Sequence, residues 1–129
     1  MAKSVSDREF AAVTALSGPA RYCHFIGQIA DWAEVWSLRG PGGWVLAAGA
    51  DGRPLVPAWP HARYAEACAA GGWAGAVPEA IPLDRWLEAW LPELARDGRG
   101  LAVFPVPNGS GVPVESERLA ADLSKAMEQ

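Results

Sequence analysis

The residues best suited to chemistry lie in one short stretch, LVPAWPHARY, at residues 55–64. An apolar run ends there in Trp59, and His61, one of two histidines, follows two residues later, after Pro60. His61, Tyr64 and Cys68 recur at spacings of three and four, which predicts one face of a helix. Because the first turn of a helix leaves N–H groups unpaired and favours anions, a neutral imidazole there could act as a base or bind a carboxylate.

The alternative interpretation makes His61 a polar first-turn residue that packs on Trp59. Distance excludes a dyad of His61 and Cys68, since seven helical residues span about 10 Å and a nucleophile needs its base within about 3 Å. Cys23 and His24 are helical neighbours and point in different directions. No spacing among the two cysteines and two histidines suits zinc. We therefore expect no metal and no cofactor, and assign no catalytic residue.

Tryptophan is the unusual component of the sequence, with seven residues in 129. Burying one indole removes about 200 Å² from water, worth at most roughly 5 kcal/mol, so most of the seven must be core. A small core leaves one or two for a groove or interface. Trp73 is the best candidate, because GGWAG places it on a loop among small residues, where aromatic rings serve as binding hot spots. The alternative is a ring that plugs the end of a sheet.

Composition and charge narrow the class of protein. A chain of 129 residues, half of them hydrophobic, has the size and composition of one globular domain. A net charge of −4 without a basic stripe argues against nucleic acid as a partner. The apolar runs fall far short of the roughly 20 residues of a membrane span. The N-terminus has no apolar signal region and the cysteines form no C-x-x-C motif, which predicts a cytoplasmic protein with reduced thiols.

Two helices are predicted at the N-terminus. Ser6 and Glu9, three residues apart, form a capping box at the start of the first. Ser17 is the candidate N-cap of the second, with Pro19 in the first turn, where its missing N–H is harmless. Apolar residues at helical spacing carry this helix to about Asp31. The short connection predicts a helical hairpin.

A composition shift at residue 36 marks the start of predicted strands. The segment 36–59 reads as an antiparallel meander, with Asp51 and Gly52 as a hairpin turn. Pro54 and Pro57 predict that its last strand lies at a sheet edge or carries a bulge, because proline cannot donate to a ladder.

The rest of the chain is predicted to alternate helices with strands. The expected elements are a helix over 61–70, an extended segment over 76–83, a helix over 84–96, a hairpin of 101–106 with 112–114, and a last helix capped by Ser116. Pro92 falls opposite the apolar arc of its helix, where it kinks the helix or starts a second segment. Together these elements predict a single α+β domain over residues 1–129, with a mostly antiparallel sheet of about five or six strands covered by helices.

Four stretches of this sequence resemble a known family: DWAEVWSLRGPGGWVLA, VPAWPHARYAEACAAGGWAG, AIPLDRWLEAWLPEL and LAVFPVPNGSGVPVESERLAADL. They are similar to the bacterial domain of unknown function 2750 (DUF2750) over nearly the whole chain, and Trp-Pro-His and FPVPNG are the more specific parts. The resemblance implies a small, stand-alone, cytosolic bacterial domain. It implies no activity, so no catalytic residues are carried over. The second half also resembles the SseB-type N-terminal domain in its pattern of elements.

Two functional hypotheses follow. The first is a non-enzymatic regulatory or immunity-like module that binds another protein through Trp59, His61, Tyr64 and the Trp73 loop. The second is a protein or enzyme that binds a small molecule or anion with His61 at a helix start. A concave pocket of at least about 300 Å³ lined by the first three residues would favour the second hypothesis. Neither nucleic acid nor a membrane is expected as a partner, and self-association into a homo-oligomer is left open.

Overall fold

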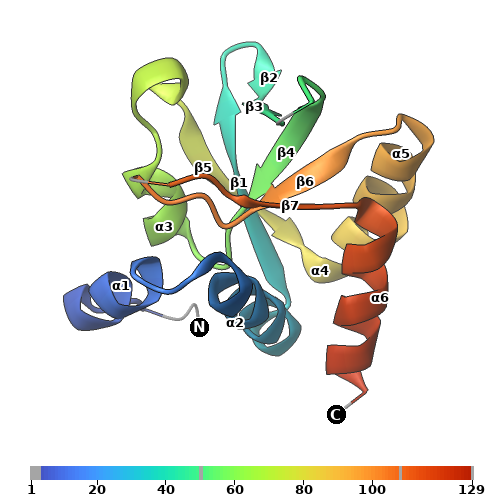
Figure 1. Ribbon diagram of the computed structural model, residues 1–129, viewed down its shortest axis with the longest axis horizontal. Helices are drawn as coiled ribbons and strands as arrows, with labels where there is room; N and C mark the ends of the chain where they lie inside the picture. Colours follow the sequence, from blue (N-terminus) through green and yellow to red (C-terminus); the bar gives the residue numbers. More distant parts are fainter. Residues whose placement is uncertain (1–3, 50, 108, 129) are drawn as a thin grey trace.

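Seven short strands form two sheets in the computed structural model, which describes residues 4–49, 51–107 and 109–128 (Figure 1). The first sheet has the order β2-β1-β5, from Gly43–Trp44, Glu34–Gly40 and Val77–Pro82. The second has the order β3-β4-β6-β7, from Ala47–Ala48, Pro54–Ala58, Gly100–Val103 and Val112–Val114. Among the strands of the described residues, β4 and β6 are the one pair that runs parallel. The α+β class is confirmed, whereas the strands number seven in two sheets instead of about five or six in one.

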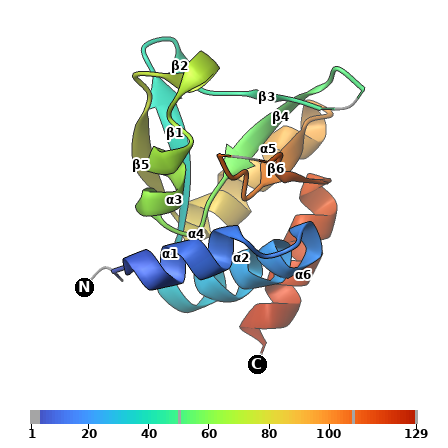
Figure 2. The same ribbon diagram turned by 60° about the vertical axis from the view of Figure 1, so that its left-hand side comes forward.

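The helices supply most of the covering for these sheets. They are α1 (Asp7–Thr14), α2 (Gly18–Trp32), α3 (Ala62–Ala67), the 3₁₀ turn η1 (Gly71–Trp73), the run α4 (Leu83–Arg85), η2 (Trp86–Trp90) and α5 (Leu91–Arg96), and α6 (Ser116–Met127). Helices α1, α2 and α6 gather below the sheets, and η1 lies at the upper end (Figures 1 and 2). Buried side chains from both sheets and the helices, such as Phe25, Leu38 and Phe104, join in one hydrophobic core.

The predicted N-caps of the first two helices are confirmed. Ser6 Oγ accepts the N–H of Glu9 at 3.1 Å, and Ser17 Oγ accepts the N–H of Ala20 at 3.3 Å. The prediction for the last helix is wrong by one residue, because Ser116 is already helical and Glu115 holds the extended N-cap position. The Glu115 side chain is occupied elsewhere, since it accepts a hydrogen bond from Arg53.

The predicted division of the helix over 84–96 at Pro92 is also confirmed. A new segment begins at Leu91, with Pro92 in its first turn. The preceding segment η2 is π-helical, and the N–H of Leu91 reaches Trp86 O, five residues back. Trp86 is fully buried and stacks on Trp90 at a centroid distance of 5.5 Å. Two of the seven tryptophans are thereby fixed in and beside the core.

The two sheets touch at one point and then diverge. Trp36 and Trp59 exchange backbone hydrogen bonds of 2.9 and 2.8 Å, and Ser37 Oγ donates to Pro57 O at 2.7 Å. Beyond this point β1 and β4 separate, as Figure 2 shows. The prediction that Pro54 and Pro57 place β4 at an edge is wrong, because β4 lies between β3 and β6. Proline is tolerated at position 57 because it faces the gap between the sheets, where no ladder hydrogen bond is lost.

The true edge strands carry prolines that face outward. Trp36 and Leu38 of β1 bond to residues outside β5, so the alternate residues of β1 are the ones that pair with β5. Pro78 and Pro82 lie opposite Leu38 and Glu34, and therefore direct their backbones away from β1.

The same holds at the edge of the second sheet. Phe104 N–H donates to Ala58 O of β4, so Ala102, two residues earlier, also turns toward β4. Pro113 of β7 lies opposite Ala102 and faces away from β6.

Candidate binding groove

Trp59 and Trp73 lie together where the sheets diverge. Trp59 is fully buried, and its Nε1–H donates to Pro105 O at 2.8 Å. The rings of Trp59 and Trp73 meet edge to face at a centroid distance of 6.0 Å. Trp73 is half-buried, and its Nε1–H donates to Leu46 O at 3.3 Å. The more exposed Trp73 ring thus packs against the buried ring of Trp59.

His61 and Tyr64 lie elsewhere in the fold. His61 is the N-cap of α3, one residue before the predicted first turn, and its Nδ1 accepts the N–H of Arg63 at 3.1 Å. Tyr64 is buried between Phe10, stacked at 5.5 Å, and Phe104, at 4.8 Å. Helix α3 has six residues, shorter than the predicted 61–70. The structure therefore brings together Trp59 and Trp73 but not His61 or Tyr64.

A groove of about 830 Å³ opens beside Trp73, and we call it the Trp73 groove. It lies over β3, β4 and β6, between the α3–η1 segment and the turn that follows β6. Its seventeen described lining residues are Ala47, Ala48, Gly49, Leu55, Ala67, Cys68, Ala70, Gly71, Trp73, Ala102, Pro105, Val106, Pro107, Gly109, Ser110, Gly111 and Pro113. Five alanines, four glycines and three prolines dominate this set, and none of the seventeen is charged. The groove is therefore an uncharged, mostly apolar concavity.

The turn between β6 and β7 forms one wall of the groove and is tightly built. The backbone of Phe104 is left-handed, with φ of 56°, and turns the chain out of β6. A Cβ on Gly111 would lie 3.0 Å from Pro105 Cγ and from the carbonyl carbon of Ala102, so these neighbours would have to move by a few tenths of an ångström to accept it. Close approach therefore favours glycine at position 111. Asn108 of the predicted hairpin tip lies outside the described residues.

Arg21 of α2 is hydrogen-bonded to the turn that forms this wall of the groove. Its side chain is 9% exposed and donates three hydrogen bonds to backbone carbonyls. Nε reaches Phe104 O at 3.2 Å, Nη2 reaches Ser110 O at 3.1 Å, and Nη1 reaches Leu16 O at 2.8 Å. Charged donors make the stronger class of hydrogen bond, so this one residue fixes both ends of the turn relative to α2.

Cys68 and Ser110 are the lining side chains of a nucleophilic type, and Cys68 is the one whose pKa is shifted. Its Sγ donates to Pro105 O at 3.4 Å, and burial raises the pKa of the thiol to about 11. The thiolate is the reactive form, so Cys68 is inert at neutral pH. Across the part of the chain that the structure describes, no group of three or more histidine, cysteine, aspartate or glutamate residues could hold a metal ion.

The sequence predicts one wall of the groove, Trp73, but not the opposite wall formed by the turn at 105–111. Trp73 was identifiable from its setting among glycines and alanines. The turn at 105–111 carries the FPVPNG signal, but its pairing with Trp73 depends on tertiary contacts. Arg21 has no sequence signal at all, because nothing local distinguishes it from a surface arginine.

Comparisons with known proteins place the chain in a family. No helix among the described residues is long and apolar enough to cross a membrane. Neither the curated proteins nor the solved structures contain a match to the chain. A family model described as "Protein of unknown function (DUF2750)" matches residues 22–123, a span that includes every residue lining the Trp73 groove. The chain belongs to the DUF2750 family.

Proposed function

We propose that this protein is a non-enzymatic binding module that holds an uncharged, apolar segment of a partner protein in the Trp73 groove. The observation that carries the proposal is the groove itself, about 830 Å³ of mostly apolar space without a charged lining residue. This volume falls within the roughly 300–1,000 Å³ of ligand sites in proteins. A regulatory adaptor of the bacterial cytoplasm is the role that fits such a module.

The lining favours a segment of polypeptide as the ligand. Small side chains let a backbone approach closely, and the prolines at 105, 107 and 113 keep the floor and rim rigid. Trp73 adds a large ring with few rotatable bonds, which suits an anchor that loses little entropy on binding. A charged ligand would lose its hydration in this groove without gaining a partner charge.

The rival hypothesis of anion binding at His61 has less support. Nδ1 of His61 accepts the N–H of Arg63, so the imidazole serves as a helix cap. His61 does not line the Trp73 groove, and α3 has only six residues. The small-molecule hypothesis predicted a pocket lined by Trp59, His61 and Tyr64. Trp59 and Tyr64 are instead buried in the core.

Peptide display with the full chain as bait tests the proposal. Selected peptides should be apolar and uncharged at their centre. Trp73→Ala should raise their Kd by about 30-fold or more, the effect of losing a hot spot. Trp32→Ala, which removes a tryptophan 45% exposed and outside the groove, should change the Kd less than about twofold. Selected peptides that bind Trp73→Ala as tightly as wild type would refute the assignment.

A further inference from the structure

A second concavity lies between the end of α2, the start of α4 and the end of α6. The ends of α2 and α6 lie at the lower side of the molecule in Figure 1. The volume of this concavity is about 530 Å³, and it shares no lining residue with the Trp73 groove. Ala33, Leu83, Leu87 and Met127 provide its apolar walls. We call it the acidic-rimmed pocket, for the reasons that follow.

One large apolar side chain is exposed in the wall of this pocket, and a second belongs to a residue next in sequence to a lining residue. Met127, in its wall, is 48% exposed, and Trp32, next in sequence to the lining residue Ala33, is 45% exposed. They are two of the five large hydrophobic side chains exposed in the described part of the chain. Methionine adapts its shape readily and is common at surfaces that bind varied apolar partners. Apolar area grouped around a concavity indicates a surface that another molecule covers.

Acidic side chains surround the same opening. Asp84 and Glu88 line it directly. Glu34 begins β1 opposite Pro82, which also lines the pocket. These three carboxylates come from three elements, α4, η2 and β1, so the negative charge lies on more than one side of the apolar walls.

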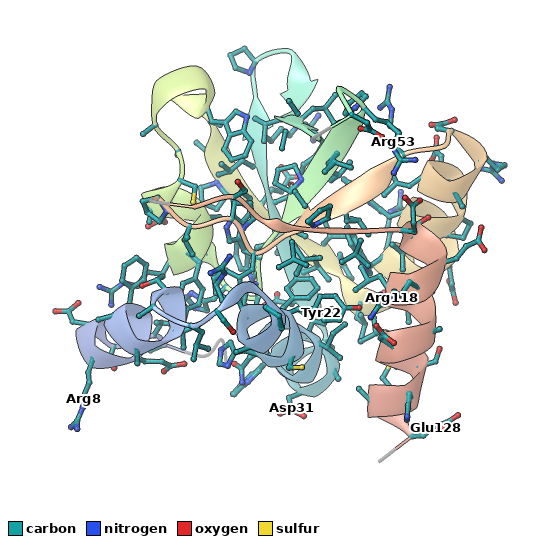
Figure 3. All side chains as sticks on the ribbon, viewed as in Figure 1. Arg8, Tyr22, Asp31, Arg53, Arg118 and Glu128 are labelled. Carbon is teal, nitrogen blue, oxygen red and sulfur yellow. The ribbon has the colours of Figure 1, made fainter. Side chains whose placement is uncertain are left out.

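Further acids lie beyond this rim, and basic residues do not balance them. Figure 3 places Asp31 and Glu128 along the same lower side, at the ends of α2 and α6. Within the described ranges, none of the five acids takes part in an ion pair. Lys125 lies about 160° around α6 from Met127 and so faces away from the pocket, on the side of Glu128, which follows it by three residues. Arg85 lines a different cavity, with Trp44 and Trp90.

We infer that the acidic-rimmed pocket docks a basic amphipathic helix or extended segment of a partner protein. Its apolar side chains would cover Met127 and Leu87, and its lysines or arginines would meet Asp84, Glu88 and the outer acids. Charge complementarity selects this occupant, because unpaired carboxylates attract a cationic segment and repel anionic lipid and nucleic acid. The inference is independent of the Trp73 groove.

A synthetic helix tests the inference. The probe is a fluorescein-labelled 18-residue peptide, with leucine on one face and lysine on the other. Its Kd is measured by anisotropy at low and at about 0.5 M salt. Asp84→Asn with Glu88→Gln should raise the Kd about tenfold at low salt, and Met127→Gln should raise it about fivefold. Trp73→Ala should leave it unchanged, which separates this surface from the groove.

A second double variant is the matched control for charge. Glu93→Gln with Asp97→Asn removes the same charge from the same helical run, but these side chains line the cavity beside Trp90. The control should change the Kd less than about twofold, and circular dichroism should show that both double variants fold.

Several results would overturn the inference. Equal weakening by the two double variants would mean attraction to net charge alone. A scrambled peptide of the same composition that binds equally well would remove the amphipathic requirement. Equal binding of a leucine–glutamate helix, or of vesicles of anionic lipid, would mean that the rim does not select for cations.

Discussion

Replacing Arg21 by methionine should destabilise the protein by about 4 kcal/mol, an unusually large effect for a residue with no acidic partner. Methionine fills similar space but donates nothing. Three carbonyls that now accept hydrogen bonds from one buried guanidinium would lose their donor at once.

The magnitude follows from where those carbonyls lie. Phe104 O is buried, so an unsatisfied acceptor there costs about 2–3 kcal/mol. Leu16 O and Ser110 O are in partly exposed surroundings, where water can replace the arginine. Each of those losses is worth about 0.5–1 kcal/mol. The contributions share one side chain and are not strictly additive, which leaves about 3–5 kcal/mol in total.

Urea unfolding followed by tryptophan fluorescence measures the effect, with Arg21→Lys as the conservative comparison. Lysine carries the charge but cannot place three donors in the fixed fork of a guanidinium, so it should recover less than half of the loss. Hydrogen exchange should also show earlier opening of the amides near residues 104–111, because Arg21 ties that turn to α2. A loss below about 1 kcal/mol for Arg21→Met would refute the reasoning, since water would then serve all three carbonyls equally well.

Four further outcomes are expected. Tyr64 Oη is buried and finds no hydrogen-bond partner among the described residues, so Tyr64→Phe should leave stability at neutral pH unchanged or raise it by up to about 1 kcal/mol; a loss above that in urea unfolding would contradict the assignment. Burial raises the pKa of Tyr64 to about 12, against about 10 in the unfolded chain, so the neutral hydroxyl favours the folded state less and less as the pH rises from 10 toward 12. Phenylalanine has no proton to lose, so Tyr64→Phe should lose less stability than wild type over this range. Identical alkaline unfolding curves for the two proteins would contradict the raised pKa. At pH 8 a thiol reagent should modify the exposed Cys23 quickly and Cys68 only after unfolding, and mass spectrometry of the native protein should find one modified site. Gly111→Ala should cost about 1–3 kcal/mol in thermal or urea unfolding, because its Cβ would meet Pro105 and the Ala102 carbonyl carbon, and a neutral result would mean that the turn can move aside.

Local signals predicted the elements that local energies determine. Ser6 and Ser17 predicted the starts of two helices because an N-cap side chain accepts a hydrogen bond from an unpaired N–H within three residues of itself. The antiparallel pairing of β6 with β7 was also predictable from a local signal, the turn residues between them, although β6 ends at Val103 and not at the predicted residue 106, because Phe104 is left-handed. Pro92 marked a new helical segment, as its missing N–H requires.

Long-range pairing was beyond that kind of inference. The parallel contact of β4 with β6 joins segments more than forty residues apart, and no periodicity distinguishes it from a meander. Pro57 was placed at an edge because sequence alone could not predict the gap between the sheets. His61 was predicted as a candidate site because its tertiary surroundings could not be predicted, whereas in the structure its ring caps α3. The hydrogen bond from Trp59 to Pro105 O could not be predicted for the same reason.

The outward-facing prolines at 78, 82 and 113 limit how this protein can be recognised. A partner strand that approaches β5 or β7 finds missing N–H groups where it needs donors, so it cannot extend either sheet. The other two edge strands, β2 and β3, have two residues each and are too short to serve as templates. Edge-to-edge aggregation through these strands is disfavoured in the same way. A partner that the protein binds would therefore have to be held by side chains and concavities, because strand addition at the sheet edges is disfavoured.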